Sequence, residues 1–162
     1  MKHRFLIYAL TLSLAGCSSL PPSSRTTTDH VINRQLDPKA EEAVLYSLGL
    51  LDTGYRFGGR NPEAGLDCSG MVIYIYNQVA SMNLSGSAAD LAKRGHAVDK
   101  RDLLPGDLVF FNTSGRSFSH VGLYIGDNRF IHAPSTNGKV RIERLDSSYF
   151  SSRFEVARTL FD

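Results

Sequence analysis

Residues 65–76 read GLDCSGMVIYIY, and this stretch decides how the rest of the chain is arranged. The apolar run after Cys68 fits either a buried strand or a helix, because periodicity does not separate the two in so short a run. Met71, Ile75 and Val79 recur at helical spacing, and Asp67 is a candidate N-terminal cap. A helix that begins here would place Cys68 at the positive end of the helix dipole, where a thiol ionises more readily.

A helical pattern also precedes this stretch. Asp37 can cap a helix, Pro38 suits its first position, and Gly54 is a candidate stop. The apolar residues at helical spacing, which we expect to face the core, are Val44, Leu48 and Leu51. The pattern therefore predicts a helix that begins after Asp37 and ends near Gly54.

Residues 87–95, SAADLAKRG, predict a short helix with Ser87 and Asp90 in capping-box spacing and Gly95 at its end. Beyond it, short β-rich runs are separated by Gly, Asn, Asp and Ser turns: DLLPGDLVFF, HVGLYIG, RFIHAP, KVRIERL and RFEVARTL. Helical patterns followed by strand patterns predict an α+β domain, in which N-terminal helices pack on a C-terminal antiparallel β-sheet.

The N-terminus has the pattern of an export signal. Lys2 and Arg4 form a basic start, an apolar segment follows, and LAGC ends at Cys17. Such a segment is too short for a lasting membrane span and is typical of a cleaved signal, here residues 1–16. LAGC resembles the lipobox of bacterial lipoproteins, which implies that Cys17 is acylated and becomes the new N-terminus. An ordinary signal peptide is the alternative.

The lipobox resemblance and Ser18 after the cysteine imply an anchor on the periplasmic face of the outer membrane, held by more than one acyl chain. Residues 17–36 are then a lipidated start and a Ser-, Thr- and Pro-rich tether, and residues 37–162 are one domain. Loss of Lys2 and Arg4 leaves 16 of the 18 basic residues against 16 acidic ones. This balance gives no indication of a nucleic-acid partner, no cofactor is indicated, and we expect a monomer.

Cys68 is the one cysteine left once Cys17 carries lipid, so it has no partner for an internal disulfide. A cysteine nucleophile needs a base within hydrogen-bond reach and a group that orients the base. His120 and His132 lie on adjacent predicted strands separated by a GDN turn. Side chains alternate along a strand, so the two histidines share a face only if the hairpin has a three-residue loop or a β-bulge.

Three motifs together resemble the NlpC-type cell-wall peptidases, a papain-like family: GYRFGGRNPEAGLDCSG, DLLPGDLVFF and SHVGLYIGDNRFIHAPST. The resemblance extends from about residue 41 to the C-terminus and implies a papain-like NlpC-type fold. It also implies roles for six residues: Cys68 as nucleophile, His120 as base, His132 as its orienting partner, Tyr55 near the oxyanion or substrate, and Asp67 and Ser69 as substrate contacts.

The same resemblance implies a peptidoglycan hydrolase that acts on stem peptides, usually at the bond between D-glutamate and meso-diaminopimelate. Where many relatives have Leu-Pro-Arg after the cysteine helix, residues 84–87 read LSGS, so the contribution of that arginine is not carried over. Two alternatives are a catalytically silent murein-binding lipoprotein and a transpeptidase with the same acyl-enzyme.

Each candidate also has a structural interpretation. Cys68 can be a small core residue, strand histidines are more often structural than catalytic, Tyr55 can pack and Asp67 can simply cap. Cys68, His120 and His132 could instead bind zinc, although the sequence has no closely spaced ligand pair among them. We therefore predict a Cys-His-His peptidase without a metal.

Overall fold

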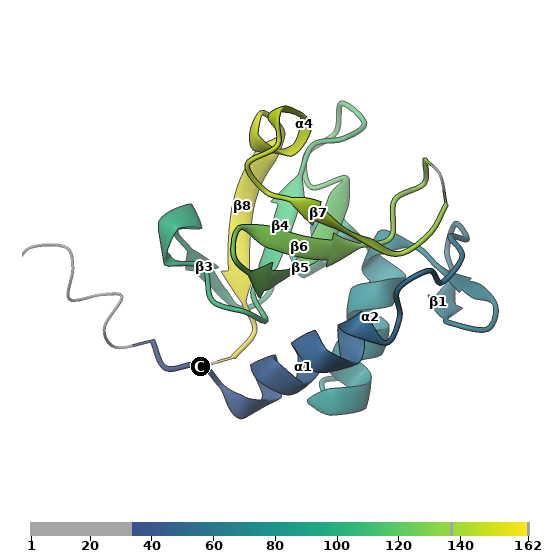
Figure 1. Ribbon diagram of the computed structural model, residues 1–162, viewed down its shortest axis with the longest axis horizontal. Coiled ribbons are helices and arrows are strands. Elements are labelled where there is room, and N and C mark those ends of the chain that lie inside the picture. The colour runs from purple at the N-terminus through teal and green to yellow at the C-terminus, as the bar shows by residue number, and fades with distance from the viewer. Residues whose placement is uncertain (1–33, 137, 162) are drawn as a thin grey trace, which may run out of the picture.

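The computed structural model describes residues 34–136 and 138–161 (Figure 1). The longer elements are α1 (Pro38–Leu48), α2 (Cys68–Val79), β4 (Leu108–Phe111), β5 (His120–Gly126), β6 (Arg129–His132), β7 (Arg141–Arg144) and β8 (Phe154–Thr159). The shorter ones are β1 (Arg60–Asn61), β2 (Gly65–Leu66), α3 (Ala88–Leu91), β3 (His96–Val98), the 3-10 helix η2 (Lys100–Asp102) and α4 (Ser148–Ser151). The predicted signal, Cys17 and the tether as far as residue 33 lie outside the described residues.

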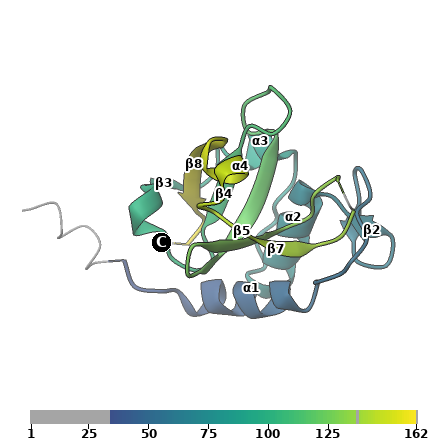
Figure 2. The ribbon, with the colours of Figure 1, turned by 45° about the horizontal axis from the view of Figure 1, so that its top comes forward.

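Six strands form one antiparallel sheet in the order β3-β8-β4-β5-β6-β7, and β1 and β2 form a separate hairpin. Helices α1 and α2 lie together on one side of this sheet (Figures 1 and 2), and α2 packs mainly against β5. This arrangement confirms the predicted α+β class. Among the described residues, no helix combines the length and the apolar character that a bilayer crossing requires.

The stretch that was ambiguous between strand and helix is helical. Helix α2 begins at Cys68, and the Gly70 amide donates to the Asp67 carboxylate in an N-terminal cap. Eight of its twelve residues are buried, among them Met71, Ile75 and Val79. The buried residues of α2 belong to the main hydrophobic core, and Cys68 at its start packs against that core. The packing of the helix therefore holds Cys68 in place.

Helix α1 begins as predicted, with Pro38 at its first position and Asp37 accepting a hydrogen bond from the Lys39 amide. The predicted end near Gly54 is wrong, because the helix stops at Leu48. The predicted inner face is also wrong: its buried residues are Ala40, Ala43 and Ser47, whereas Leu48 and Leu51 are more than a third exposed. A Cβ at Gly106 would lie 2.5 Å from the Ala40 Cβ. The loop that contains Gly106 can therefore lie this close to α1 only because both positions hold small residues.

The five predicted β-rich runs contain β4, β5, β6, β7 and β8. The sequence did not reveal β1, β2, β3 or α4; β3 begins at His96, which pairs with Thr159. Strands of two or three residues are too short to show an alternating pattern, so only their partners define them. Ser87 and Asp90 form the predicted capping box, but helix α3 ends at Leu91 rather than near Gly95.

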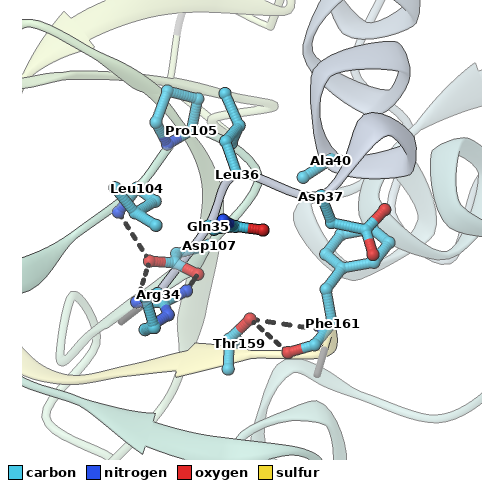
Figure 3. A pocket seen from close by; sticks show the side chains of 10 residues that line it. All are labelled: Arg34, Gln35, Leu36, Asp37, Ala40, Leu104, Pro105, Asp107, Thr159 and Phe161. Carbon is cyan, nitrogen blue, oxygen red and sulfur yellow. Dashed lines mark hydrogen bonds and ion pairs between the residues drawn. The ribbon is translucent and has the colours of Figure 1, made fainter. Parts of the chain in front are cut away.

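Arg34, near the end of the predicted tether, is bound to the domain. Its guanidinium contacts the buried Asp107 carboxylate through two nitrogen–oxygen pairs at 2.5 and 3.1 Å (Figure 3). Asp107 also accepts a hydrogen bond from the Leu104 amide. The cavity beside this ion pair, of about 350 Å³, shares no lining residue with the two cavities described below.

Candidate active site

Cys68 lies at the first position of α2, where Asp67 organises the surrounding backbone. One Asp67 carboxylate oxygen accepts hydrogen bonds from the Gly70 amide at 2.6 Å and the Ser69 hydroxyl at 3.0 Å. The other accepts from the Gly58 amide at 2.9 Å. The carboxylate therefore joins the start of the helix to the glycine-rich loop before it.

Glycines allow that loop to lie against the helix. A Cβ at Gly70 would lie 1.9 Å from the carbonyl oxygen of Gly59, and a Cβ at Gly59 would lie 2.2 Å from the carbonyl oxygen of Gly65. No side chain fits at such distances. The glycines of GGR and CSG thus have a steric role in holding the loop beside Cys68.

His120 and His132 are hydrogen-bonded to each other, with 2.7 Å between His120 Nε2 and His132 Nδ1. The strands pair Leu123 with Ile131 and Tyr124 with Phe130, and the register then shifts before Gly126 pairs with Arg129. This shift is a β-bulge, one of the two arrangements, a three-residue loop or a bulge, that would let the two histidines share a face. A two-residue turn with positive φ at both Asp127 and Asn128 closes the hairpin.

Gly122, between the two histidines in the sheet, makes space for the ring of Phe130. A Cβ at Gly122 would lie 2.5 Å from Phe130 Cδ2. The rings of Phe130 and Phe150 pack against His132, with centroids 5.0 and 5.3 Å from the imidazole. This apolar contact leaves His132 1% exposed and fixes its orientation.

The 2.7 Å contact uses Nε2 of His120 and leaves its Nδ1 as the basic nitrogen. In the tautomer suited to catalysis, His120 Nε2–H donates to His132 Nδ1, and His132 carries its own proton on Nε2. A hydrogen bond from the backbone of Val121, the residue after His120, lowers the pKa of the Cys68 thiol. The thiol therefore lies against the start of β5, where His120 is located.

The pKa values of Cys68 and His120 do not favour a thiolate in the resting protein, although Cys68 lies at a helix N-terminus. Burial raises the pKa of the Cys68 thiol, and the Val121 hydrogen bond opposes this only in part, while the charge of Asp67 adds to it. Burial lowers the pKa of His120 to about 4, and the Asp67 charge opposes that shift. At neutral pH the resting site thus holds a neutral thiol and a neutral imidazole, because burial of the thiol outweighs the backbone hydrogen bonds that lower its pKa.

His132 is also neutral. Burial, followed by the charges of His120 and Arg141, lowers its pKa to about 2. A neutral His132 can accept a hydrogen bond on Nδ1 while it is protonated on Nε2. This is the form in which it can hold His120 in the catalytic tautomer.

Tyr55, Asp67, Cys68 and Ser69 line one cavity of about 620 Å³. Burial raises the pKa of Tyr55, and the charges that Cys68, once ionised, and Asp67 carry raise it further. The structure thus brings together the predicted substrate or oxyanion residues and the predicted nucleophile. Their chemical roles stay predictions.

Sequence reasoning missed four large residues of this cavity: Phe57, Arg60, Arg116 and Phe118. Phe57 is 88% exposed although it is aromatic, and Arg116 belongs to the loop between β4 and β5. The LSGS segment, which lacks the arginine of many relatives, contributes Gly86 and Ser87 to the wall. The one available sequence signal was an aromatic residue, Phe57, directly before two glycines.

A second cavity of about 410 Å³ borders His120 and His132 but not Cys68. Its charged residues are Arg141 and Glu143. Within residues 34–136 and 138–161, no three His, Cys, Asp or Glu side chains gather as ligands of a metal ion. The two histidines instead direct nitrogens at each other.

Residues 52–159 match the model of the NlpC/P60 family. The chain belongs to this family. It is 36% identical over 162 residues to the protein named probable endopeptidase NlpC of Escherichia coli K12, covering 97% of this chain and 99% of that one. The NlpC/P60 match thereby confirms the resemblance drawn from the three motifs.

Two other relatives are larger than this chain. Murein DD-endopeptidase MepH of Escherichia coli K12 is 36% identical over 107 residues, which are 64% of this chain and 40% of that protein. Gamma-DL-glutamyl hydrolase of Bacillus subtilis 168 is 33% identical over 129 residues, which are 78% of this chain and 31% of that protein. In both, the match spans less than half of the relative.

A solved structure shares the fold. The crystal structure of an NlpC/P60 family protein from Bacillus cereus ATCC 10987 superposes with a TM-score of 0.72 and is 29% identical. The superposition covers 78% of this chain and 42% of that one. The likeness supports the predicted papain-like arrangement of helices on an antiparallel sheet.

Proposed function

We propose that this protein is a peptidoglycan hydrolase, a cysteine endopeptidase that cleaves the bond between D-glutamate and diaminopimelate in stem peptides. The observation that carries the proposal is the 2.7 Å contact between His120 and His132, together with Cys68 at a helix N-terminus and a hydrogen bond from the Val121 backbone, next to His120, to the Cys68 thiol. A thiol, a neutral base and a partner that orients the base make up a nucleophilic site. The endopeptidase names of several relatives support the same class.

In the proposed reaction His120 Nδ1 takes the thiol proton as sulfur attacks the amide carbon. The C–N bond then breaks, and the His120 imidazolium gives the proton to the leaving nitrogen. Water, deprotonated by His120, cleaves the thioester and restores the thiol. His132 stays hydrogen-bonded to His120 Nε2 and stabilises its positive charge in each step.

Digestion of purified sacculi, followed by mass spectrometry, tests this proposal. We expect fragments that end in D-glutamate, together with peptides whose new N-terminus is diaminopimelate. The names of MepH and the gamma-DL-glutamyl hydrolase correspond to two different bonds, so the masses decide between them. Loss of the cross-links while the stem peptides stay whole would contradict the proposed bond. Undigested sacculi would contradict hydrolysis.

We also propose that the protein is a lipoprotein of the outer membrane, anchored through Cys17. The support is the sequence LAGC after an apolar segment, followed by Ser18. In cells grown with labelled palmitate, we expect Cys17→Ala to remove the label and to leave an unprocessed chain that still cleaves stem peptides. Cys68→Ala is the matched control and should keep the label; unchanged labelling of Cys17→Ala would refute the anchor.

A further inference from the structure

Two cavities divide the candidate residues: Cys68 lines one of them, and His120 and His132 line the other. The cavity of about 620 Å³ contains Cys68, on which the acyl half of the substrate stays after the first step. The cavity of about 410 Å³ contains His120, which gives its proton to the leaving nitrogen, and lacks Cys68. Because the amine half departs on the side of the acid, the second cavity is the place for the residue that bears the leaving nitrogen.

A charged pair and a buried imidazole face this second cavity. Arg141 lies opposite His132 in the β6–β7 register, and Glu143, two residues further, is on the same face. Arg141 Nε donates to Glu143 Oε1 at 2.8 Å, and both side chains remain about one third exposed. Nε2 of His132, in a residue 1% exposed, has no hydrogen-bond partner among the described residues.

The pair can make further hydrogen bonds, with Arg141 as donor and Glu143 as acceptor. Arg141 Nη1 donates to the Thr136 carbonyl oxygen at 3.3 Å, while Arg141 Nη2 and Glu143 Oε2 make no hydrogen bond within the described part of the chain. A free guanidinium nitrogen matches a carboxylate, and a free carboxylate oxygen matches an ammonium group. Together they are complementary to the zwitterionic head of an amino acid.

We propose that Arg141 and Glu143 form a subsite for a zwitterionic amino-acid head on the residue that bears the leaving nitrogen. The inference rests on the proposed function, since that residue is then diaminopimelate, whose second centre carries both an ammonium and a carboxylate. Arg141 binds the carboxylate and Glu143 the ammonium. Lysine at the same place has the ammonium alone, so the subsite selects diaminopimelate stems.

Three soluble tripeptides test the subsite on the wild-type protein: L-alanyl-γ-D-glutamyl-meso-diaminopimelate, its analogue amidated at the second carboxylate, and its L-lysine analogue. Charge-assisted hydrogen bonds of this kind correspond to about 10- to 100-fold in binding. We expect kcat/KM to fall by about that factor from the first peptide to either analogue, mainly through KM. Equal kcat/KM values for the first two peptides would overturn the inference without any variant.

Variants assign the effect to the pair. Arg141→Gln should make the free and amidated peptides equivalent, and Glu143→Gln should weaken all three peptides through their ammonium group. Arg144→Gln on the same strand is the matched control, because Arg144 is exposed, pairs with Asp146 and does not line the cavity. Undiminished selectivity in Arg141→Gln would contradict the subsite.

A binding measurement separates this inference from the proposed function. Calorimetric titration of Cys68→Ala protein with the meso-diaminopimelate tripeptide and with its L-lysine analogue should show about 10-fold weaker binding of the lysine peptide, in which the α-amine is already in the peptide bond. Similar affinities would overturn the subsite even if stems are cleaved. Failure of the wild-type protein to cleave any of the three peptides or sacculi would instead refute the proposed function.

Discussion

Replacing Cys68 with alanine should abolish cleavage of stem peptides, with a loss of about 10⁴-fold or more in kcat. The side chain supplies the only thiol in the described residues, and the neighbouring hydroxyl of Ser69 at the start of α2 is hydrogen-bonded to Asp67 instead. Cys68→Ser should fail too, because a hydroxyl ionises far less readily than a thiol. The measurement is the release of fragments from purified sacculi.

The fold should survive either change. Cys68 is at the edge of the core. Alanine removes its partly buried sulfur atom, and serine replaces the sulfur with a smaller oxygen. Thermal unfolding of each variant serves as the control and should be close to that of the wild type. Full activity in either folded variant would exclude Cys68 as the nucleophile and would favour a catalytically unrelated role for the thiol.

Much of the fold follows from local sequence signals. Asp37, Asp67 and Ser87 were each predicted as helix caps, and each accepts the expected backbone hydrogen bond, because capping depends on a few adjacent residues. The end of α1 and its buried face were not predictable in this way. The buried face depends on tertiary contacts such as the close approach of Ala40 to the loop at Gly106.

The candidate site shows the same division. The sequence placed His120 and His132 on adjacent strands and required a three-residue loop or a bulge, but nothing in GDN indicated that the extra residue would precede the turn. The pKa of Cys68 was misjudged because the helix dipole is a local property, whereas burial depends on the whole packed core. The second cavity was missed because Arg141 joins the site only through its pairing with His132.

His120 and His132 should differ in the size and the pH dependence of their effects. In the proposed mechanism His120 is both base and acid, so His120→Ala should lose about 10⁴-fold or more in kcat/KM. In that mechanism His132 only fixes the tautomer and stabilises the imidazolium, so the loss in His132→Leu should be about 100-fold smaller than the loss in His120→Ala. Leucine suits the apolar contact with Phe130 and Phe150, so the fold should be kept.

The acid limb of the wild-type profile follows from the lowered pKa of His120. Its imidazole is neutral and able to act as a base above about 4, and activity should fall as pH decreases through that value. Without His120 the reaction needs free thiolate, and burial raises the pKa of Cys68. The residual rate of His120→Ala should then rise about 10-fold per pH unit through the neutral range, where the wild-type rate is flat.

His132→Asn separates orientation from simple packing. Its side-chain oxygen can occupy a place close to Nδ1 of His132 and accept the proton of His120 Nε2, which leucine cannot do. We therefore expect His132→Asn to recover much of the activity lost in His132→Leu, with the flat pH profile of the wild type in both. If His132→Leu instead shows the larger loss and the rate that rises with pH, His132 is the base and His120 its orienting partner.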